Sequence, residues 1–526
     1  MSSAANKHHS EAAHAPVMLQ GFEWNTPAGG NHWQWLRDNA ARFAAMGITA
    51  IWIPPATKGG NQDGTGYDIY DMWDLGEFER KPGEGDGTRT KYGTRQQLEE
   101  CIGALRQHHI VVYMDLVWNH KDGADGTENF KAIKVDSENR SKDISEPIEI
   151  EGWTSFTFPG RQAKHSGFQW SFNHFTGVDY DNKSGDKSIY RIVGEGKDWA
   201  DDVDEEKGGF DFLLGADIDH AHPDVREEFT RYAKWLVRTF PIAGMRFDAV
   251  KHFSRAFLAS MVKVMREEAR QIRKEAGKEP FDETDGPCLF AVGELWKDSI
   301  ETIVHYVTNF EGEQMSLFDA PLHYNFKEAG DTAENFDLRK ILDGTMMQKR
   351  PIDAVTLVEN HDTQPGQSLA SPISAIFKPL AYALILLRAE GYPCVFLGDL
   401  DGCHAEGDSQ PSVPKMNDLD KFIKARKYFG AGEQREYWDH PNCIGWVRTG
   451  ADENGGCAVV LCNGSGDGGK RMEIGKDHAG EKWVDVVGWR KGEVTIGDDG
   501  WADFHCHPRS AAIWARKDAD AIKEFA

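Results

Sequence analysis

The chain has 526 residues, of which 40% are hydrophobic and 11% aromatic, and this composition argues against a disordered protein. A chain of this length is too long for one simple core, so we expect a large domain with at least one further module. The formal net charge is −25. An acidic surface repels phosphate, which argues against nucleic acid and anionic membranes as partners.

The first residues and the cysteines bear on where the protein works. Residues 1–15 are polar and lack the apolar stretch of a secretory signal, and no later segment approaches the ~18 apolar residues of a membrane span. We therefore expect a disordered tail over 1–15 and a soluble, cytoplasmic protein. The eight cysteines include no CxxC pair, so we expect free thiols.

Apolar, β-rich runs recur along the chain with helical patterns between them. Runs that are apolar on both faces are typical of parallel strands covered by helices, and eight such units close a (β/α)8 barrel. The intervening segments have apolar residues at the i, i+3, i+4 spacing of covering helices. We therefore predict an α/β fold of the TIM-barrel type. The predicted strands lie in VMLQGFEW (17–24), ITAIWIP (48–54), IVVYMDLVW (110–118), IAGMRFDAV (242–250), CLFAVGELW (288–296), MSLFDAPL (315–322), AVTLVENH (354–361) and YPCVFLGDL (392–400).

Two long segments depart from this repeat. Residues 121–221, between the third strand and the helix that opens at Pro223, are too many for a structureless loop and predict a small inserted domain. Over 431–516, short alternating runs split by glycines predict a C-terminal antiparallel β-sandwich. The barrel would then comprise residues 16–120 and 222–430, and residues 517–526 are expected to form a frayed tail.

Three carboxylates lie at the ends of three predicted strands: Asp248 in GMRFDAVKH, Glu294 in LFAVGELW and Asp362 in VTLVENHDT. Barrel enzymes carry catalytic groups at the carboxyl ends of strands, here strands 4, 5 and 7. Arg246 lies two residues before Asp248 on the same face of its strand, and its guanidinium favours the ionised form that a nucleophile needs. The anionic neighbours Asp248 and Asp362 should raise the pKa of Glu294, as a general acid requires.

These roles match glycoside cleavage with retention of configuration. One carboxylate attacks the anomeric carbon, while a second carboxyl protonates the leaving oxygen and then deprotonates water. His120, His252 and His361 lie at the same strand ends and could donate hydrogen bonds to sugar hydroxyls. In the alternative, structural interpretation, the carboxylates cap helices and form ion pairs, and each histidine belongs to the core.

Four segments, DLVWNH, GMRFDAVKH, GELW and VENHDT, occur in this order, with a long insertion after the first. The chain thereby resembles the α-amylase family of glycoside hydrolases, and it is most similar to the bacterial liquefying type and its fungal intracellular relatives. The likeness spans nearly the whole chain, from GFEW to SAAIWAR. It implies Asp248 as nucleophile, Glu294 as acid/base and Asp362 as the residue that stabilises the transition state.

The resemblance also implies which residues hold the sugar around the cleaved bond. Aromatic side chains suit this role because pyranose rings present C–H faces to π surfaces. Trp24 is a further candidate for stacking, although core packing explains it at least as well. The substrate-binding set is Tyr67, His120, Arg246, Lys251, His252, Trp296 and His361.

The insertion ends in an acidic, glycine-containing stretch, DWADDVDEEKGGFDFLLGADIDHAHPD, which on composition alone is a solvated loop. Ca²⁺ takes six to eight oxygen ligands, which this stretch and a barrel loop could supply together. The resemblance maps a calcium site onto the Asn119 amide, the Asp211 and Asp217 carboxylates and the His252 backbone carbonyl. Such an ion would hold the insertion against the barrel without taking part in the chemistry.

The bacterial relatives hold further ions nearby, and the resemblance places uncharged residues at the ligand positions of those ions. Thr176, Ala200 and Ala221 cannot supply an anionic ligand, although Asp219 remains and Asp201 could compensate. A second family site, between barrel and sandwich, is also weakened, since Pro441, Asn442 and Asn463 stand at its positions. We therefore predict one calcium ion.

The leading hypothesis is endo-hydrolysis of α-1,4-glucosidic bonds in starch, glycogen or maltooligosaccharides. A transglucosylase would use the same covalent intermediate and pass the glucosyl chain to another sugar, and the sequence leaves that choice open. A non-catalytic glucan-binding protein would be expected to lack one of the three carboxylates, and all three are present. We expect an α-glucan as the partner and a monomer, while the sequence does not define the oligomeric state.

Overall fold

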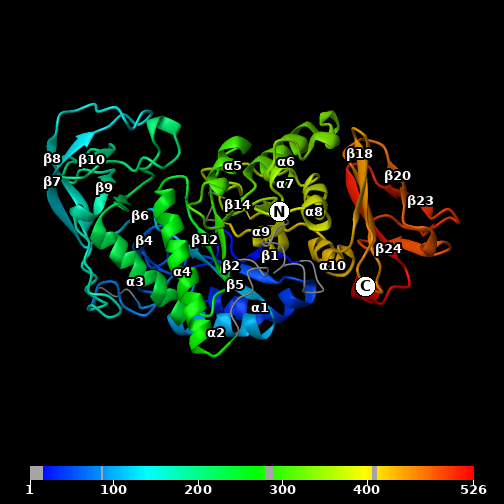
Figure 1. The fold of residues 1–526 in the computed structure, drawn as a ribbon, viewed down its shortest axis with the longest axis horizontal. Coiled ribbons are helices and arrows are strands. Elements are labelled where there is room, and N and C mark those ends of the chain that lie inside the picture. Colours follow the sequence, from blue (N-terminus) through cyan, green and yellow to red (C-terminus); the bar gives the residue numbers. More distant parts are fainter. Residues whose placement is uncertain (1–15, 84–86, 279–287, 406–411, 526) are drawn as a thin grey trace.

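The computed structural model describes residues 16–83, 87–278, 288–405 and 412–525. The tail expected over 1–15 lies outside the described residues. The molecule is elongated, with a central barrel, an inserted sheet at the left of Figure 1 and a C-terminal sandwich at its right. No helix among the described residues is long and apolar enough to cross a membrane.

Eight parallel strands close the central barrel in the order β1-β16-β15-β14-β13-β12-β5-β2. Each predicted run contributes one strand, so the predicted (β/α)8 barrel is confirmed. Closure joins the first strand to the last, with Met18 paired to Cys394 on one side and to Ala50 on the other. The strands are β1 (Met18–Gln20), β2 (Ala50–Ile53), β5 (Val111–Leu116), β12 (Gly244–Phe247), β13 (Phe290–Gly293), β14 (Ser316–Phe318), β15 (Ala354–Leu357) and β16 (Tyr392–Phe396).

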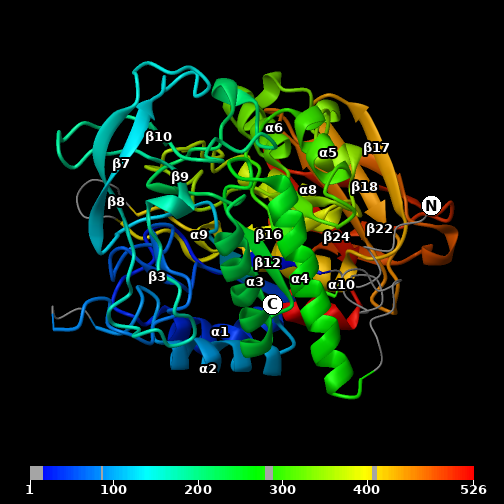
Figure 2. The same ribbon diagram turned by 60° about the vertical axis from the view of Figure 1, so that its left-hand side comes forward.

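Helices surround the barrel because their apolar stripes pack on the strands and their polar faces remain in water. Local signals set their ends: Thr94 and Gln97 form a capping box before α2, and His222 caps α3, which opens with Pro223. Figure 2 shows α3 and α4 side by side on the outside of the barrel. The helices are α1 (His32–Met46), α2 (Arg95–Gln107), α3 (Pro223–Thr239), α4 (Arg255–Glu275), α5 (Ile300–Thr308), α6 (Ala320–Thr332), α7 (Met346–Lys349), α8 (Lys378–Leu387), α9 (Leu397–Asp401) and α10 (Leu419–Phe429).

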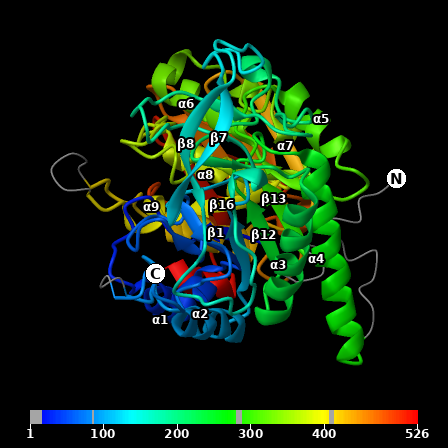
Figure 3. The same cartoon turned by 90° about the vertical axis from the view of Figure 1, so that its left-hand side faces the viewer.

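The insertion folds into a six-stranded sheet in the order β6-β11-β9-β10-β7-β8, and a small ladder of β3 (Lys58–Gly59) and β4 (Ile69–Asp71) lies in the loop after β2. In the end-on view, β7 and β8 lie in front of the barrel strands (Figure 3). The short strand β6 follows β5 after three residues, so the sheet begins at the rim formed by the carboxyl ends of the barrel strands. Its strands are β6 (His120–Lys121), β7 (Gly126–Lys134), β8 (Ile148–Ser155), β9 (Phe175–Val178), β10 (Tyr190–Ile192) and β11 (Ala216–Ile218).

The C-terminal region forms an antiparallel six-stranded sheet, β17-β18-β19-β24-β21-β22, and a two-stranded sheet, β20-β23, so the predicted antiparallel β domain is confirmed. Strands β19 and β24 also contact α8, which explains why every residue of that helix except Pro379 is buried. The strands are β17 (Gln434–His440), β18 (Cys443–Arg448), β19 (Cys457–Cys462), β20 (Gly468–Glu473), β21 (Lys482–Asp485), β22 (Val494–Thr495), β23 (Trp501–Cys506) and β24 (Ser510–Arg516).

The expectation of a frayed tail over 517–526 needs correction for the described residues. Asp520–Phe525 form a 3-10 helix, and the Phe525 ring stacks on Phe429 of α10 at 5.8 Å between centroids. Lys424 of the same helix donates to the Glu524 carbonyl. The apolar pair Ala521 and Phe525 is buried against α10, and this burial orders a segment whose composition looked merely polar.

Candidate active site

The three predicted carboxylates meet at one rim of the barrel. Asp248 and Glu294 directly follow the paired strands β12 and β13, whose last residues, Phe247 and Gly293, are in register. Asp362 lies in the loop after β15 and is hydrogen-bonded to Glu294. The side chains of Asp248 and Glu294 are each about 10% exposed, so the carboxylates line a site that is nearly closed to water.

Arg246 joins the groups of this site. Its side chain is fully buried, and one terminal nitrogen, Nη1, lies 2.6 Å from Asp248 Oδ1 and 2.9 Å from Asp115 Oδ1. The other, Nη2, lies 2.7 Å from Glu294 Oε2. A guanidinium is a rigid, planar group, so it fixes the positions of Asp115, Asp248 and Glu294 relative to one another.

Asp115 is a functional residue that the sequence reasoning missed. It lies on β5 in register with Arg246, and its Oδ2 accepts hydrogen bonds from the Tyr67 hydroxyl at 2.8 Å and from Trp52 Nε1 at 2.9 Å. Burial raises its pKa to about 6, against the opposing effect of Arg246. The signal was present in the sequence, because Asp115 is the only charged residue in the run IVVYMDLVW.

The environment of the site raises the pKa of two carboxyls. Burial raises the pKa of Glu294 well above its usual value, and Asp248 and Asp362 raise it further, while Arg246 opposes the shift. The predicted direction is therefore correct, but burial has a larger effect than the anionic neighbours named in the sequence analysis. Burial likewise raises the pKa of Asp362 to about 7. At neutral pH the pair can share a proton that Glu294 donates to Asp362.

An aromatic stack borders the carboxylates. The Tyr67 and His361 rings lie 5.0 Å apart and nearly parallel, and Trp24 stacks on Tyr67 at 6.0 Å. Trp24 is half-buried on the catalytic rim, so the core-packing alternative for this residue is wrong. Gln20 Nε2 lies 3.0 Å from His361 Nδ1, and this contact leaves Nε2 of the imidazole facing Asp362 at 3.3 Å.

The other two histidines differ from His361 in what their rings contact. His120 Nε2 donates to the Tyr67 carbonyl at 2.8 Å and its Nδ1 lies 3.3 Å from the Asn119 amide, so both nitrogens have protein partners. His120 therefore positions Tyr67. His252 donates from Nδ1 to the Phe210 carbonyl at 2.9 Å, and burial lowers its pKa to about 4, so the ring is neutral with Nε2 as an acceptor.

The two remaining residues predicted to contact the substrate are Lys251, which follows β12, and Trp296, which follows β13. Lys251 Nζ lies 2.6 Å from Glu206 of the inserted segment, a partner that the sequence did not indicate. Trp296 donates from its indole nitrogen to the Tyr324 hydroxyl at 2.9 Å. Lys251 and Leu295, which are close in sequence to Asp248 and Glu294, line a cavity of about 560 Å³.

The residues predicted to bind calcium form a buried oxygen cluster. The Asn119 side-chain oxygen is buried and accepts no hydrogen bond from the described residues. Asp211 and Asp217 are buried and hydrogen-bonded to each other, and Thr176 donates to Asp217. Burial raises the pKa of Asp211 to about 8 and that of Asp217 well above its usual value. Two buried carboxylates beside an unpartnered amide oxygen are a donor set that fits Ca²⁺.

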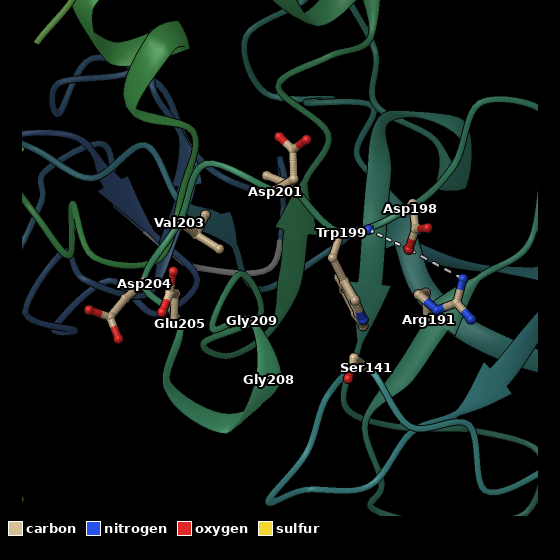
Figure 4. Close-up of a pocket in the computed structure, with 11 residues that line it drawn as sticks. Ser141, Arg191, Asp198, Trp199, Asp201, Val203, Asp204, Glu205, Gly208 and Gly209 are labelled. Carbon is tan, nitrogen blue, oxygen red and sulfur yellow. Dashed lines mark hydrogen bonds and ion pairs between the residues drawn. The ribbon is translucent and has the colours of Figure 1, made fainter. Parts of the chain in front are cut away.

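A second cavity, of about 510 Å³, lies between the inserted sheet and the segment 201–209 (Figure 4). The indole of Trp199 points between Arg191 on one wall and Gly208 on the other in this view. The Ala200 amide, at the edge of the cavity, donates to Asp211 at 2.9 Å, so the cavity borders the oxygen cluster. None of the three predicted catalytic carboxylates lines it.

A (β/α)8 barrel with an arginine-bound carboxylate after strand 4 and a carboxyl of raised pKa after strand 5 has the arrangement of retaining glycoside hydrolases. The sequence model of the α-amylase catalytic-domain family matches residues 42–448 of this chain. The chain belongs to the α-amylase family.

Individual relatives agree over nearly the whole length. A glucan 1,4-α-maltohexaosidase of Bacillus sp. (strain 707) is 43% identical over 95% of this chain and 92% of its own. A cytoplasmic α-amylase of Escherichia coli is 40% identical over 95% of this chain and 98% of its own. The crystal structure of an Anoxybacillus α-amylase has the same fold, with a TM-score of 0.61 at 16% identity over 98% of this chain and 99% of its own.

Proposed function

We propose that the protein hydrolyses internal α-1,4-glucosidic bonds of starch, glycogen or maltooligosaccharides with retention of configuration. The observation that carries this proposal is the Arg246 fork, which contacts Asp248 and Glu294 at 2.6 and 2.7 Å. One guanidinium spans the two carboxyl groups, as expected for the ~5–5.5 Å spacing of retaining enzymes. Relatives that are 40 to 43% identical are named for the same class of activity.

In the first step, Asp248 attacks the anomeric carbon while Glu294 gives its proton to the leaving oxygen. Arg246 and Asp115 hold Asp248 in place, and the raised pKa of Glu294 supplies the proton at neutral pH. In the second step, Glu294 removes a proton from water, which attacks the glucosyl ester on Asp248. Asp362 stabilises the oxocarbenium-like transition state of both steps.

The aromatic stack supplies a platform for the glucose ring on the carboxylate rim. Tyr67 and Trp24 present π faces to the C–H face of the sugar, and His361 Nε2 and Arg246 are the neighbouring polar groups. Lys251 lines the 560 Å³ cavity, and Lys251, Trp296 and His252 would contact the leaving-side sugars. His120 contributes indirectly through the Tyr67 carbonyl.

Two variants test the assignment of the carboxyls. Asp248→Asn removes the nucleophile, and Glu294→Gln removes the acid, so each should lower kcat on starch by about 10²-fold or more. Asp298→Asn, an exposed carboxylate four residues after Glu294, is the matched control and should keep full activity. Full activity in either catalytic variant would refute its role.

Product analysis separates hydrolysis from transfer. With pure maltoheptaose, hydrolysis gives only shorter sugars, and proton NMR should show the α-anomer first because the configuration is retained. Products longer than maltoheptaose would assign the protein to the transglucosylases, and a β-anomer would exclude the covalent mechanism.

We further propose that one calcium ion binds Asn119, Asp211, Asp217 and the His252 carbonyl. When bound, it supplies positive charge to the two carboxylates and holds the insertion on the barrel. A single ion is favoured because Asp219, one of the acidic groups nearby, is already paired with Lys197 at 2.6 Å. At the sandwich border, Asn463 Nδ2 donates to the Ala333 and Phe336 carbonyls, so protein contacts replace a metal there.

The domain limits and the location of the protein belong to the same proposal. We place the catalytic barrel at 16–120 and 222–430, the inserted domain at 121–221 and the C-terminal domain at 431–516. A cytoplasmic location is supported by the E. coli relative, whose name states it, and by the free thiols of the eight cysteines. We expect a monomer.

A further inference from the structure

Three cysteines converge inside the C-terminal sandwich, far from the catalytic carboxylates in sequence. Cys443 and Cys462 are cross-strand partners on β18 and β19, and Cys506 is the partner of Gly468 on β23 and β20. The first two belong to the six-stranded sheet and Cys506 to the two-stranded sheet. All three thiols are free.

Gly468 lets the three cysteine side chains approach one another. A Cβ built on this glycine would lie 2.6 Å from Cys462 Cβ, 2.8 Å from Cys506 Sγ and 3.2 Å from Cys443 Sγ. The cysteine side chains therefore fill the space that any larger residue at 468 would need. The Cys506 thiol donates a hydrogen bond to the Cys462 sulfur, across the gap between the two sheets.

From this geometry we propose that Cys462 and Cys506 are a reversible dithiol/disulfide pair, which exchanges with small-molecule disulfides and, when oxidised, joins the two sheets covalently.

The two cysteines have different electrostatic environments. The hydrogen bond from Cys506, together with the backbone N–H groups of Gly464 and Arg509, lowers the pKa of Cys462 to about 6, against the opposing effect of burial. That hydrogen bond and burial raise the pKa of Cys506. Cys462 is thus the thiolate that attacks, and Cys506 is the thiol that resolves the mixed disulfide.

Access to the pair comes through one short loop. Cys462 itself is buried, but the residues that cover it, Ser465, Gly466 and Asp467, are exposed. As a thiol, Cys462 donates to the carbonyls of Gly464 and Gly466 at 3.9 and 3.4 Å, so its S–H group points at this loop. Because this loop is rich in glycine and serine, it can open locally without unfolding either sheet.

The exchange is balanced in atoms and electrons. The Cys462 thiolate attacks one sulfur of oxidised glutathione, forming a mixed disulfide and releasing one glutathione thiolate. Cys506 then loses its proton to solvent and attacks the Cys462 sulfur, which releases the second glutathione thiolate. The protein loses two electrons and the small disulfide gains them.

The test is treatment of the full-length protein with oxidised glutathione at pH 8, followed by alkylation and peptide mass mapping. We expect a Cys462–Cys506 linked peptide with the loss of two hydrogens and no retained glutathione. The oxidised protein should have a higher unfolding midpoint than the reduced one, and dithiothreitol should reverse the shift. A link from Cys443, or a wild-type protein that keeps glutathione on Cys462, would overturn the proposal.

Cysteine variants test the proposal without relying on the unfolding midpoint. Cys506→Ser should trap glutathione on Cys462, whereas Cys462→Ser should leave position 506 unmodified and Cys443→Ala should leave the link intact. Cys101 and Cys457 are matched controls, because burial raises the pKa of each to about 12. Cys462 should react at least about tenfold faster than these two in the folded protein. Equal rates would overturn the proposal, and unchanged amylase activity in each variant verifies that it has folded.

Discussion

At the scale of single residues, the site depends on how buried charges are paired. Arg246 is fully buried and has three carboxyl groups around it, so loss of the arginine would leave buried carboxylates without a compensating charge. Asp115 is part of that balance, although it takes no direct part in the proposed chemistry. Its contacts with Tyr67 and Trp52 link the arginine to the aromatic platform.

The raised pKa of Glu294 predicts how activity responds to pH. Activity needs the protonated acid, so kcat/KM should fall as the pH rises through the pKa of Glu294 in the free enzyme. Asp362 raises that pKa, so Asp362→Asn should move this basic limb to lower pH. A pH profile of the residual activity measures the shift, with Asp298→Asn as control. A limb that stays at the wild-type pH would contradict the coupling.

The buried pair Asp211 and Asp217 predicts an effect of metal removal. The pKa of Asp211 is raised to about 8, so between the unfolded value near ~3.9 and pH 8 the folded state holds more protons than the unfolded state. The free energy of unfolding of the metal-free protein should therefore fall as pH rises from 4 to about 8. Calcium should offset this loss by compensating the carboxylates.

Thermal unfolding in chelator and in calcium, at pH 5 and pH 8, measures the effect. Asp217→Asn should weaken both the pH dependence in chelator and the response to calcium. Asp198→Asn, an exposed aspartate of the same segment, should retain both. A calcium response that survives in Asp217→Asn would place the ion elsewhere.

At the scale of elements, the strands could be predicted because each is apolar on both faces, a pattern that few other structures produce. Strand ends then located Asp248 and Glu294. Asp115 was missed because a charged residue inside such a run was taken as part of the strand alone. The pairing of Lys251 with Glu206 could not be predicted, because it depends on how the insertion folds back over the rim. The helix near Phe525 depends in the same way on a tertiary contact with α10.

The insertion contains a buried ion pair, Lys197–Asp219, whose loss should lower stability by a measurable amount. Lys197 and Asp219 are both less than 10% exposed, and Lys197 also donates to the Asn173 carbonyl. Lys197→Met keeps the aliphatic length but leaves Asp219 buried and unpaired, so the free energy of unfolding should fall by about 3–5 kcal/mol. Urea unfolding measures this. Lys187→Ala, at an exposed lysine of the same insertion, should change stability by less than about 0.5 kcal/mol.

At the scale of the whole molecule, the C-terminal sandwich is joined to the barrel by amide side chains. Asn463 is 2% exposed and donates to the Ala333 and Phe336 carbonyls, each at 2.8 Å. Asn463→Ala removes both hydrogen bonds; the Ala333 carbonyl keeps the Phe336 N–H as a donor, whereas the Phe336 carbonyl loses the amide, at a cost of about 1–3 kcal/mol. Urea unfolding should therefore show a lower midpoint, while Ser465→Ala, at an exposed neighbouring position, should not. An unchanged midpoint in Asn463→Ala would show that this contact is not needed.

The closure of the barrel through β1 and β16 has a consequence for synthesis on the ribosome. Met18 pairs with Cys394, and Arg426 of α10 donates to the Pro16 carbonyl at 3.0 Å, so the start of the chain is held by residues that are made late. Domains generally fold as units and from the N-terminus, but β1 has no partner for its second edge until β16 has left the exit tunnel. The nascent chain must therefore carry an unpaired, apolar strand edge through most of its translation, and it is this interval in which a chaperone would protect it from aggregation.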